Sequence, residues 1–113
     1  MEKKVAVTIG REGIGHGDTE LGRRLVASFL HALEAERRFP CAICFFTEGV
    51  RLVVEESPVL DHLRTLEALG VRLLICRTCL DHYALTERVA VGTISNMGDI
   101  VAALFEADSV INL

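Results

Sequence analysis

The sequence has few aromatic residues, few prolines and fewer basic than acidic side chains, and each shortage excludes a class of protein. Aromatic residues make up 5% of the 113 positions and only two prolines are present, so the composition is that of a compact protein with an aliphatic core. The formal net charge is −4, whereas a protein that binds nucleic acid or an anionic membrane without sequence preference needs a basic surface. We therefore expect neither nucleic acid nor membrane as a partner.

The sequence also lacks an apolar run long enough for a signal peptide or a membrane span, because residues 1–4 lead directly into a short strand-like segment. This predicts a cytoplasmic protein. In that reducing compartment the four cysteines are expected to be thiols, metal ligands or redox groups rather than structural disulfides. The length predicts a single domain, residues 1–113, that buries its core without disulfides or metal.

Short β-branched and apolar runs alternate with longer segments of helical periodicity, which predicts an α/β fold with helices packed on a five-stranded, mainly parallel sheet. Helices are expected to begin at Asp18 or Thr19, at Ser57-Pro58, and after an Asn96 cap. The predicted strands cover residues 5–9, 41–46, 71–75, 89–91 and 109–113.

Three further predictions concern single segments and rest on the spacing of apolar residues within each of them. The first helix is expected to face the sheet with one apolar stripe, formed by Leu21, Leu25, Phe29, Ala32 and Leu33. Residues 50–55 leave two alternatives open, an irregular loop or an extra strand, and residues 80–84 predict one or two turns of helix.

The carboxyl ends of parallel strands gather at one edge of a sheet, where the loops that enter the helices lie. Four stretches follow predicted strands in this way: residues 10–17, 47–49, 76–79 and 93–96. We therefore expect them to contribute to one site.

The strongest chemical signal in these stretches is the pair Cys76 and Cys79, which follows a buried strand and begins a helix. Backbone N–H groups at a helix start stabilise a thiolate, Arg77 adds positive charge, and His82 is close in sequence. A thiolate is the nucleophile that accepts sulfane sulfur or opens a disulfide. The plainer alternative is that both cysteines only pack in the core, but their position at a strand end favours chemistry.

Cys41 and Cys44 form a second C-x-x-C pair, which raises the alternative of a four-cysteine zinc site. Residues three apart on a strand point to opposite faces, so these two thiols are not expected to reach one metal. We predict core thiols.

The glycine-rich loop with Gly13, Gly15 and Gly17 follows a strand and precedes a helix, as phosphate-binding loops do. The loop lacks the G-x-G-x-x-G spacing and the lysine of phosphate-binding loops, and Asp18 and Glu20 place negative charge where a phosphate would bind. The loop is expected to leave room around the thiols. For His16 the alternatives are a metal ligand, a proton donor or, as is more common for an isolated loop histidine, a solvated side chain; His31 and His62 are assigned no role.

Four motifs together resemble the DsrE/DsrF-like family of sulfur-relay proteins. They are C-R-T-C-L-D-H-Y at 76–83, G-x-G-D-x-x-L-G at 15–22, F-F-T-E-G-V-R-L at 45–52 and V-G-T-I-S-N-M at 91–97. Within the family the sequence is similar to the DsrE-like C-terminal domain of YedF-type proteins linked to selenium metabolism. The resemblance covers residues 5–113 and implies a three-layer α/β/α sandwich, a homo-oligomer, and a cysteine after the third strand that carries persulfide.

The resemblance implies that Cys76 is the persulfide carrier and that Cys79 resolves or shields the bound sulfur. The residues expected to shape the site are Arg77, Thr78, Gly13, Gly15, Gly17, Glu48, Gly49 and Asn96. Two positions depart from the subgroup: Arg77 replaces a glycine of C-G-T-C, and Ala84 replaces a glycine after the short helix, where a continued helix would avoid a left-handed turn.

The expected partners are sulfur donor and acceptor proteins, including a TusA-like protein, because the TusA-like domain that usually precedes this one is absent from the printed chain. No cofactor or metal is implied. Two other functions stay open: a non-catalytic module that binds a small ligand or a protein, and a dithiol oxidoreductase, which ranks last because the usual thioredoxin context is missing.

Overall fold

A computed structural model describes residues 3–113 as one five-stranded sheet in which every neighbouring pair of strands is parallel. The strand order is β4-β3-β2-β1-β5. The strands are β1 (Val5–Ile9), β2 (Ala42–Phe45), β3 (Arg72–Cys76), β4 (Thr93–Ser95) and β5 (Ser109–Asn112).

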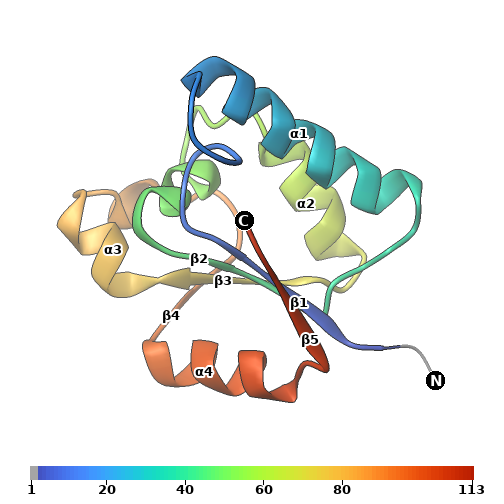
Figure 1. Cartoon of the computed structure of the whole chain (residues 1–113). Coiled ribbons are helices and arrows are strands. Elements are labelled where there is room, and N and C mark those ends of the chain that lie inside the picture. The colour runs from blue at the N-terminus through green and yellow to red at the C-terminus, as the bar shows by residue number, and fades with distance from the viewer. Residues whose placement is uncertain (1–2) are drawn as a thin grey trace.

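Helices cover both faces of this sheet, so the predicted three-layer α/β/α sandwich is confirmed (Figure 1). The chain advances from β1 to β4 in one direction and returns past β1 to β5. Because crossovers between parallel strands are right-handed, the return helix must lie on the opposite face. Figure 1 shows α1 (Thr19–Ala35) and α2 (Leu60–Ala68) on one face and α4 (Met97–Glu106) on the other, with α3 (Arg77–His82) at the strand ends.

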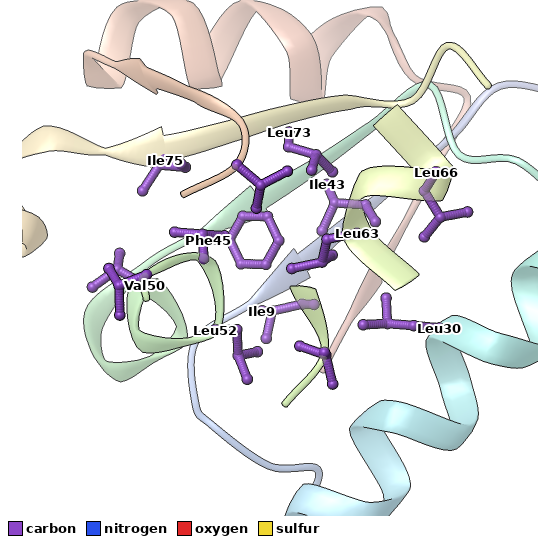
Figure 2. Close-up of a cluster of buried hydrophobic side chains, with 14 of the residues drawn as sticks. Ile9, Leu30, Ile43, Phe45, Val50, Leu52, Leu63, Leu66, Leu73 and Ile75 are labelled. Atoms are coloured by element: carbon purple, nitrogen blue, oxygen red, sulfur yellow. The ribbon is translucent and has the colours of Figure 1, made fainter. Parts of the chain in front are cut away.

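The two faces of the sheet bury two separate clusters. Alternate strand residues such as Ile9, Phe45 and Leu73 pack toward α1 and α2, as Figure 2 shows. The intervening residues, including Cys44 and Leu74, pack against Ile100 and Ala103 of α4. This alternation follows from the two-residue period of a strand, and it leaves Cys76 on the face toward α4.

The apolar stripe predicted for α1 is wrong in part. Leu21 and Leu25 are 52% and 42% exposed, and the buried positions are Gly22, Val26 and Leu30. Gly22 faces inward because the glycine-rich loop lies directly on it: the Ile14 N–H donates to the Gly22 carbonyl at 3.1 Å. That close backbone contact rotates the two leucines toward solvent.

The prediction of a strand at residues 89–91 is also wrong. Val89 makes an isolated antiparallel bridge to Val54, and the Ala90 N–H donates to the Val53 carbonyl at 2.8 Å. Only after Gly92, at φ +87, does the chain turn to pair with β3. Residues 89–91 therefore pack against the end of the 47–53 segment and Val54. The fourth strand forms further along the chain, at Thr93–Ser95.

Residues 50–55 form neither of the two predicted structures. They belong largely to the 3₁₀ helix η1 (Thr47–Val53), with Val50, Leu52 and Val53 buried in the core. A second short 3₁₀ helix, η2 (Thr86–Arg88), follows α3.

Two helix ends differ from the predictions. The helix expected at Pro58 begins at Leu60, because the Ser57 hydroxyl accepts a hydrogen bond from the Val59 N–H and caps a preceding turn.

Ala84 adopts a left-handed φ of +56 and does not continue α3. The Leu85 N–H donates to the Leu80 carbonyl at 2.8 Å, which closes the helix in the way that usually favours glycine.

Candidate functional site

Cys76 and Cys79 lie where β3 becomes α3. Cys76 is the last residue of β3 and the N-cap of α3, and Cys79 follows within the first turn of the helix. All four cysteines of the chain are free thiols. Cys76 is only 5% exposed, while Cys79 is half-buried and contacts both core clusters.

A cavity of about 310 Å³ opens on both thiols. Its other walls come from the end of β4 and the start of α4, because Ser95 is in register with Cys76 on the neighbouring strand. Asn96 caps α4 by accepting a hydrogen bond from the Asp99 N–H at 2.8 Å. The full lining is Cys76, Arg77, Thr78, Cys79, Ser95, Asn96 and Met97.

Two of these lining residues were not singled out in advance: Ser95 lies within the predicted stretch 93–96 without a named role, and Met97 lies outside all four stretches. The signal that could have found them is the position of β4: a strand placed at residues 93–95 ends at Ser95 and leads into α4. The predicted lining residues Arg77, Thr78 and Asn96 do lie on the cavity.

The pKa of Cys79 is raised, whereas the sequence predicted that the helix start would stabilise its thiolate. Burial, and then the contact with the Cys76 thiol, raise the pKa of Cys79 above its ordinary value. One contact acts in the opposite direction: the backbone N–H of Thr47 donates to the Cys79 sulfur at 3.1 Å, which lowers the pKa. The cavity therefore holds Cys79 mainly as a thiol, and Thr47 is the group that stabilises its thiolate form.

The glycine-rich loop forms a second cavity of about 470 Å³ instead of lining the one with the thiols. Gly13, Gly15, Gly17 and Glu48 all line it, together with Thr47 and Tyr83. The predicted single site is thus two neighbouring cavities. Thr47 belongs to the wall of one and contacts a thiol of the other.

Several predicted residues have structural roles around this second cavity. Arg11 bonds to the His16 ring at 2.8 Å, so His16 is not an isolated loop histidine. Gly13 packs directly on the backbone of α1, because a Cβ at this position would lie only 2.7 Å from the Gly22 backbone.

Gly49 lines neither cavity and lies against the Ile9 carbonyl. The His82 ring packs edge-on against Tyr83 at 5.0 Å between centroids.

Cys44 lies apart from both cavities, buried between β2 and α4. Burial raises the pKa of Cys44 to about 11, against a smaller opposing effect from the positive charge of Arg72. Cys41 precedes β2 and is half-buried. Within residues 3–113, no three Cys, His, Asp or Glu side chains are grouped so that they could hold a metal ion.

The raised pKa of Cys44 predicts a loss of stability at high pH. The folded pKa lies above the ordinary value of 9.0, so the stabilisation is fully present below about pH 9 and is lost as the pH rises toward about 11. The loss is expected to reach about 3 kcal/mol. Urea unfolding from about pH 8 to 11 should show this extra decline for the wild type and not for Cys44→Ala. Parallel curves for the two proteins would contradict it.

The comparisons with known proteins agree with this fold. The sequence profile of the DsrE/DsrF-like family matches residues 3–113, and the chain therefore belongs to this family. No sequence among the curated proteins matches the chain. Membership indicates a sulfur-relay type of role, since proteins of this family work in sulfur relay with partner proteins.

Solved structures show the same architecture. The chain is similar to the YchN protein from E. coli, with a TM-score of 0.73 at 18% identity over 99% of this chain and 100% of that one. It is also similar to MTH1491, a protein of unknown function from Methanobacterium thermoautotrophicum, with a TM-score of 0.70 at 20% identity over the same shares of the two chains. At these identities the likeness establishes the fold alone.

Among residues 3–113, no helix is both long and apolar enough to span a membrane.

Proposed function

We propose that this protein is a cytoplasmic sulfur carrier in which Cys76 accepts sulfane sulfur as a persulfide and passes it to an acceptor. The observation that carries the proposal is the pair of free thiols on one cavity at the carboxyl end of β3. Membership of the DsrE/DsrF-like family supports it.

The proposed uptake is a thiol exchange at sulfur. The Cys76 thiolate attacks the outer sulfur of a donor persulfide, a new S–S bond forms, and the donor leaves as a thiolate that takes up a proton. Delivery repeats the step with an acceptor thiolate, which releases Cys76 as its thiolate. The place of Cys76, 5% exposed on a cavity of about 310 Å³, supports this role because the cavity gives a small persulfide or thiol room beside the Cys76 sulfur.

Cys79 is the proposed resolving thiol. Its thiolate attacks the inner sulfur of the Cys76 persulfide, forms a Cys76–Cys79 disulfide and expels the outer sulfur as hydrosulfide. The raised pKa of Cys79 slows this loss at neutral pH, because less thiolate is present to attack. Protonated Cys79 thus protects the sulfur bound to Cys76 from release. By the resemblance to YedF-type proteins, the transferred atom is sulfur or selenium.

The remaining proposed site residues shape the two cavities. Arg77, Thr78 and Asn96 line the one with the thiols, while Gly13, Gly15, Gly17 and Glu48 line the neighbouring one. Gly49 acts through packing. The proposed partners are a sulfur donor and an acceptor, including a TusA-like protein.

We also propose that the protein is a homo-oligomer that buries the outer face of α4 against a second copy. Met97, Val101 and Phe105 are 53%, 43% and 86% exposed on that face, and the opposite side of α4 is already packed on the sheet. A row of large apolar side chains on the outer side of a helix that already packs on a sheet is typical of a protein–protein contact. The small residues Gly98 and Ala102 lie beside the large ones, so one copy offers both the protruding side chains and the space that a second copy needs.

Phe105→Glu is therefore expected to lower the oligomeric state, because it places a charge in the proposed apolar contact. Sedimentation or light scattering should show a smaller particle than for the wild type. Leu25→Glu is the matched control, since Leu25 is an exposed leucine on α1, on the other face of the sheet. A monomeric wild type, or equal dissociation by both variants, would overturn this assignment.

The alternative function is a non-catalytic module that binds a small ligand or a protein and whose thiols are incidental. The observation in its favour is that the cavity at the glycine-rich loop, at about 470 Å³, is larger than the one at the thiols, at about 310 Å³. Such a module has no reason to take up sulfur.

Sulfur loading separates the two functions. The protein is incubated with a small-molecule persulfide donor, freed of the donor and weighed by mass spectrometry. The carrier predicts one added sulfur atom on the wild type and on Cys41→Ser, and none on the double variant Cys76→Ser with Cys79→Ser. Equal loading of the wild type and the double variant, or no loading of either, would favour the binding module.

A further inference from the structure

Thr47 has an unusual backbone conformation for its residue type. Its φ is +42, in the left-handed region that β-branched residues avoid most strongly. Such a conformation persists only when the surrounding contacts enforce it, and it is found preferentially at functional sites. The contacts of Thr47 therefore indicate what the conformation achieves.

Two hydrogen bonds fix Thr47 between two parts of the fold. Its hydroxyl donates to the Gly10 carbonyl at 2.6 Å, just beyond the end of β1. Its backbone N–H donates to the Cys79 sulfur at 3.1 Å, on α3. The residue before it is anchored as well, because the Phe46 N–H donates to the Ile9 carbonyl at 3.0 Å. The peptide between Phe46 and Thr47 is thereby held in one orientation.

We propose that Thr47 is a positioning residue that aims its backbone N–H at the Cys79 sulfur and uses its hydroxyl as the anchor for that orientation. The inference rests on the proposed function, in which Cys79 is the resolving thiol. It adds a residue outside the C-x-x-C segment to the machinery that controls that thiol.

The chemistry of the sulfur explains why one fixed donor matters there. Burial and the neighbouring Cys76 thiol both disfavour a Cys79 thiolate. A backbone N–H on the sulfur favours the charged form and opposes both effects. A fixed donor therefore sets how much resolving thiolate the cavity contains at a given pH.

The identity of the residue agrees with this role. Glycine would adopt the same φ without steric strain, but it has no hydroxyl to bond to the Gly10 carbonyl. Threonine carries the strain and supplies the anchor. A serine would supply the same anchor, whereas a valine would keep the shape of the side chain and lose the bond.

The test is the pKa of Cys79, measured from the pH dependence of its alkylation rate with site-resolved mass spectrometry. Thr47→Val and Thr47→Gly both remove the anchor, so we expect them to raise the pKa by about half a unit to one unit. Thr47→Ser should restore the wild-type value. Arg37→Gly is the matched control, because Arg37 has a similar φ of +53, lies just beyond the far end of α1 and does not line the cavity with the thiols.

Circular dichroism establishes that each variant is folded before its pKa is read. An unchanged pKa in Thr47→Val and Thr47→Gly, or a serine variant that behaves like the valine variant, would overturn the inference. The measurement uses no sulfur donor, so its outcome is separate from sulfur loading. Normal loading with no effect of Thr47 would overturn this inference alone, and failed loading with the expected pKa shifts would overturn the carrier function alone.

Discussion

Replacing Gly49 with alanine is expected to destabilise the fold by about 3 kcal/mol or more, because the added methyl has no space. A Cβ at this position would lie 2.1 Å from the Ile9 carbonyl oxygen and 2.8 Å from the carbonyl carbon. Both are backbone atoms of a central strand, so they cannot move aside as a flexible side chain would. The clash would displace η1, which carries Thr47 and Glu48 into the wall of the larger cavity.

Urea unfolding followed by circular dichroism measures this loss. Gly10→Ala is the matched control, since a Cβ there would lie 3.6 Å from the Thr47 hydroxyl oxygen, an ordinary contact. The control is expected to stay within about 1 kcal/mol of the wild type. If the two variants unfold at the same urea concentration, the close packing of η1 on β1 is not what requires glycine at position 49.

Replacing Cys76 with serine is expected to abolish sulfur loading, with a decrease of more than about tenfold, because the hydroxyl cannot act as the attacking thiolate. Cys79→Ser is expected to load normally and to keep its persulfide several times longer than the wild type. The reason is that the variant cannot form the Cys76–Cys79 disulfide that expels the cargo. Time-resolved mass spectrometry after removal of the donor measures both effects.

The matched control for these variants is Cys41→Ser, which changes a half-buried thiol outside both cavities. It should load and release sulfur as the wild type does. A Cys76→Ser protein that loads fully while Cys79→Ser does not would reverse the assignment of carrier and resolving thiol.

The strand-end position of the thiols could be predicted from the sequence because it depends on strong local signals. A nearly continuous apolar run predicts a strand covered on both faces, and Cys76 follows such a run at Val71 to Ile75, which only Arg72 interrupts. Asn96 was likewise predicted as a cap, and Asp18 was one of two residues expected at the start of the first helix; both accept hydrogen bonds from the helices that follow them. The five strands, their parallel pairing and the two helical layers follow from the same alternation of patterns.

The errors arise where backbone contacts between distant segments override local pattern. The leucines of α1 face outward because Gly22 must meet the loop at residues 13–14. The fourth strand is displaced because Val89 bridges to Val54. Composition does not encode either contact, since both depend on which segments meet in three dimensions.

The division of the predicted site into two cavities has the same origin. The four strand-end stretches do gather at one edge of the sheet, as expected for parallel strands. Thr47 then separates them, through one hydrogen bond to the Gly10 carbonyl and another to the Cys79 sulfur. A threonine in a left-handed conformation is a rare choice that residue preferences predict against, so its role emerges only from the structure.

The most direct test of the carrier function is delivery of sulfur from a defined cysteine. Protein loaded by a persulfide donor is freed of the donor and mixed with a low-molecular-weight thiol as acceptor, and peptides are weighed before and after mixing. The carrier function predicts one extra sulfur atom on the peptide that contains Cys76 before mixing, and its appearance on the acceptor as a persulfide afterwards. A loaded protein whose extra sulfur is absent from that peptide, or stays on it in the presence of the acceptor, would contradict the carrier function.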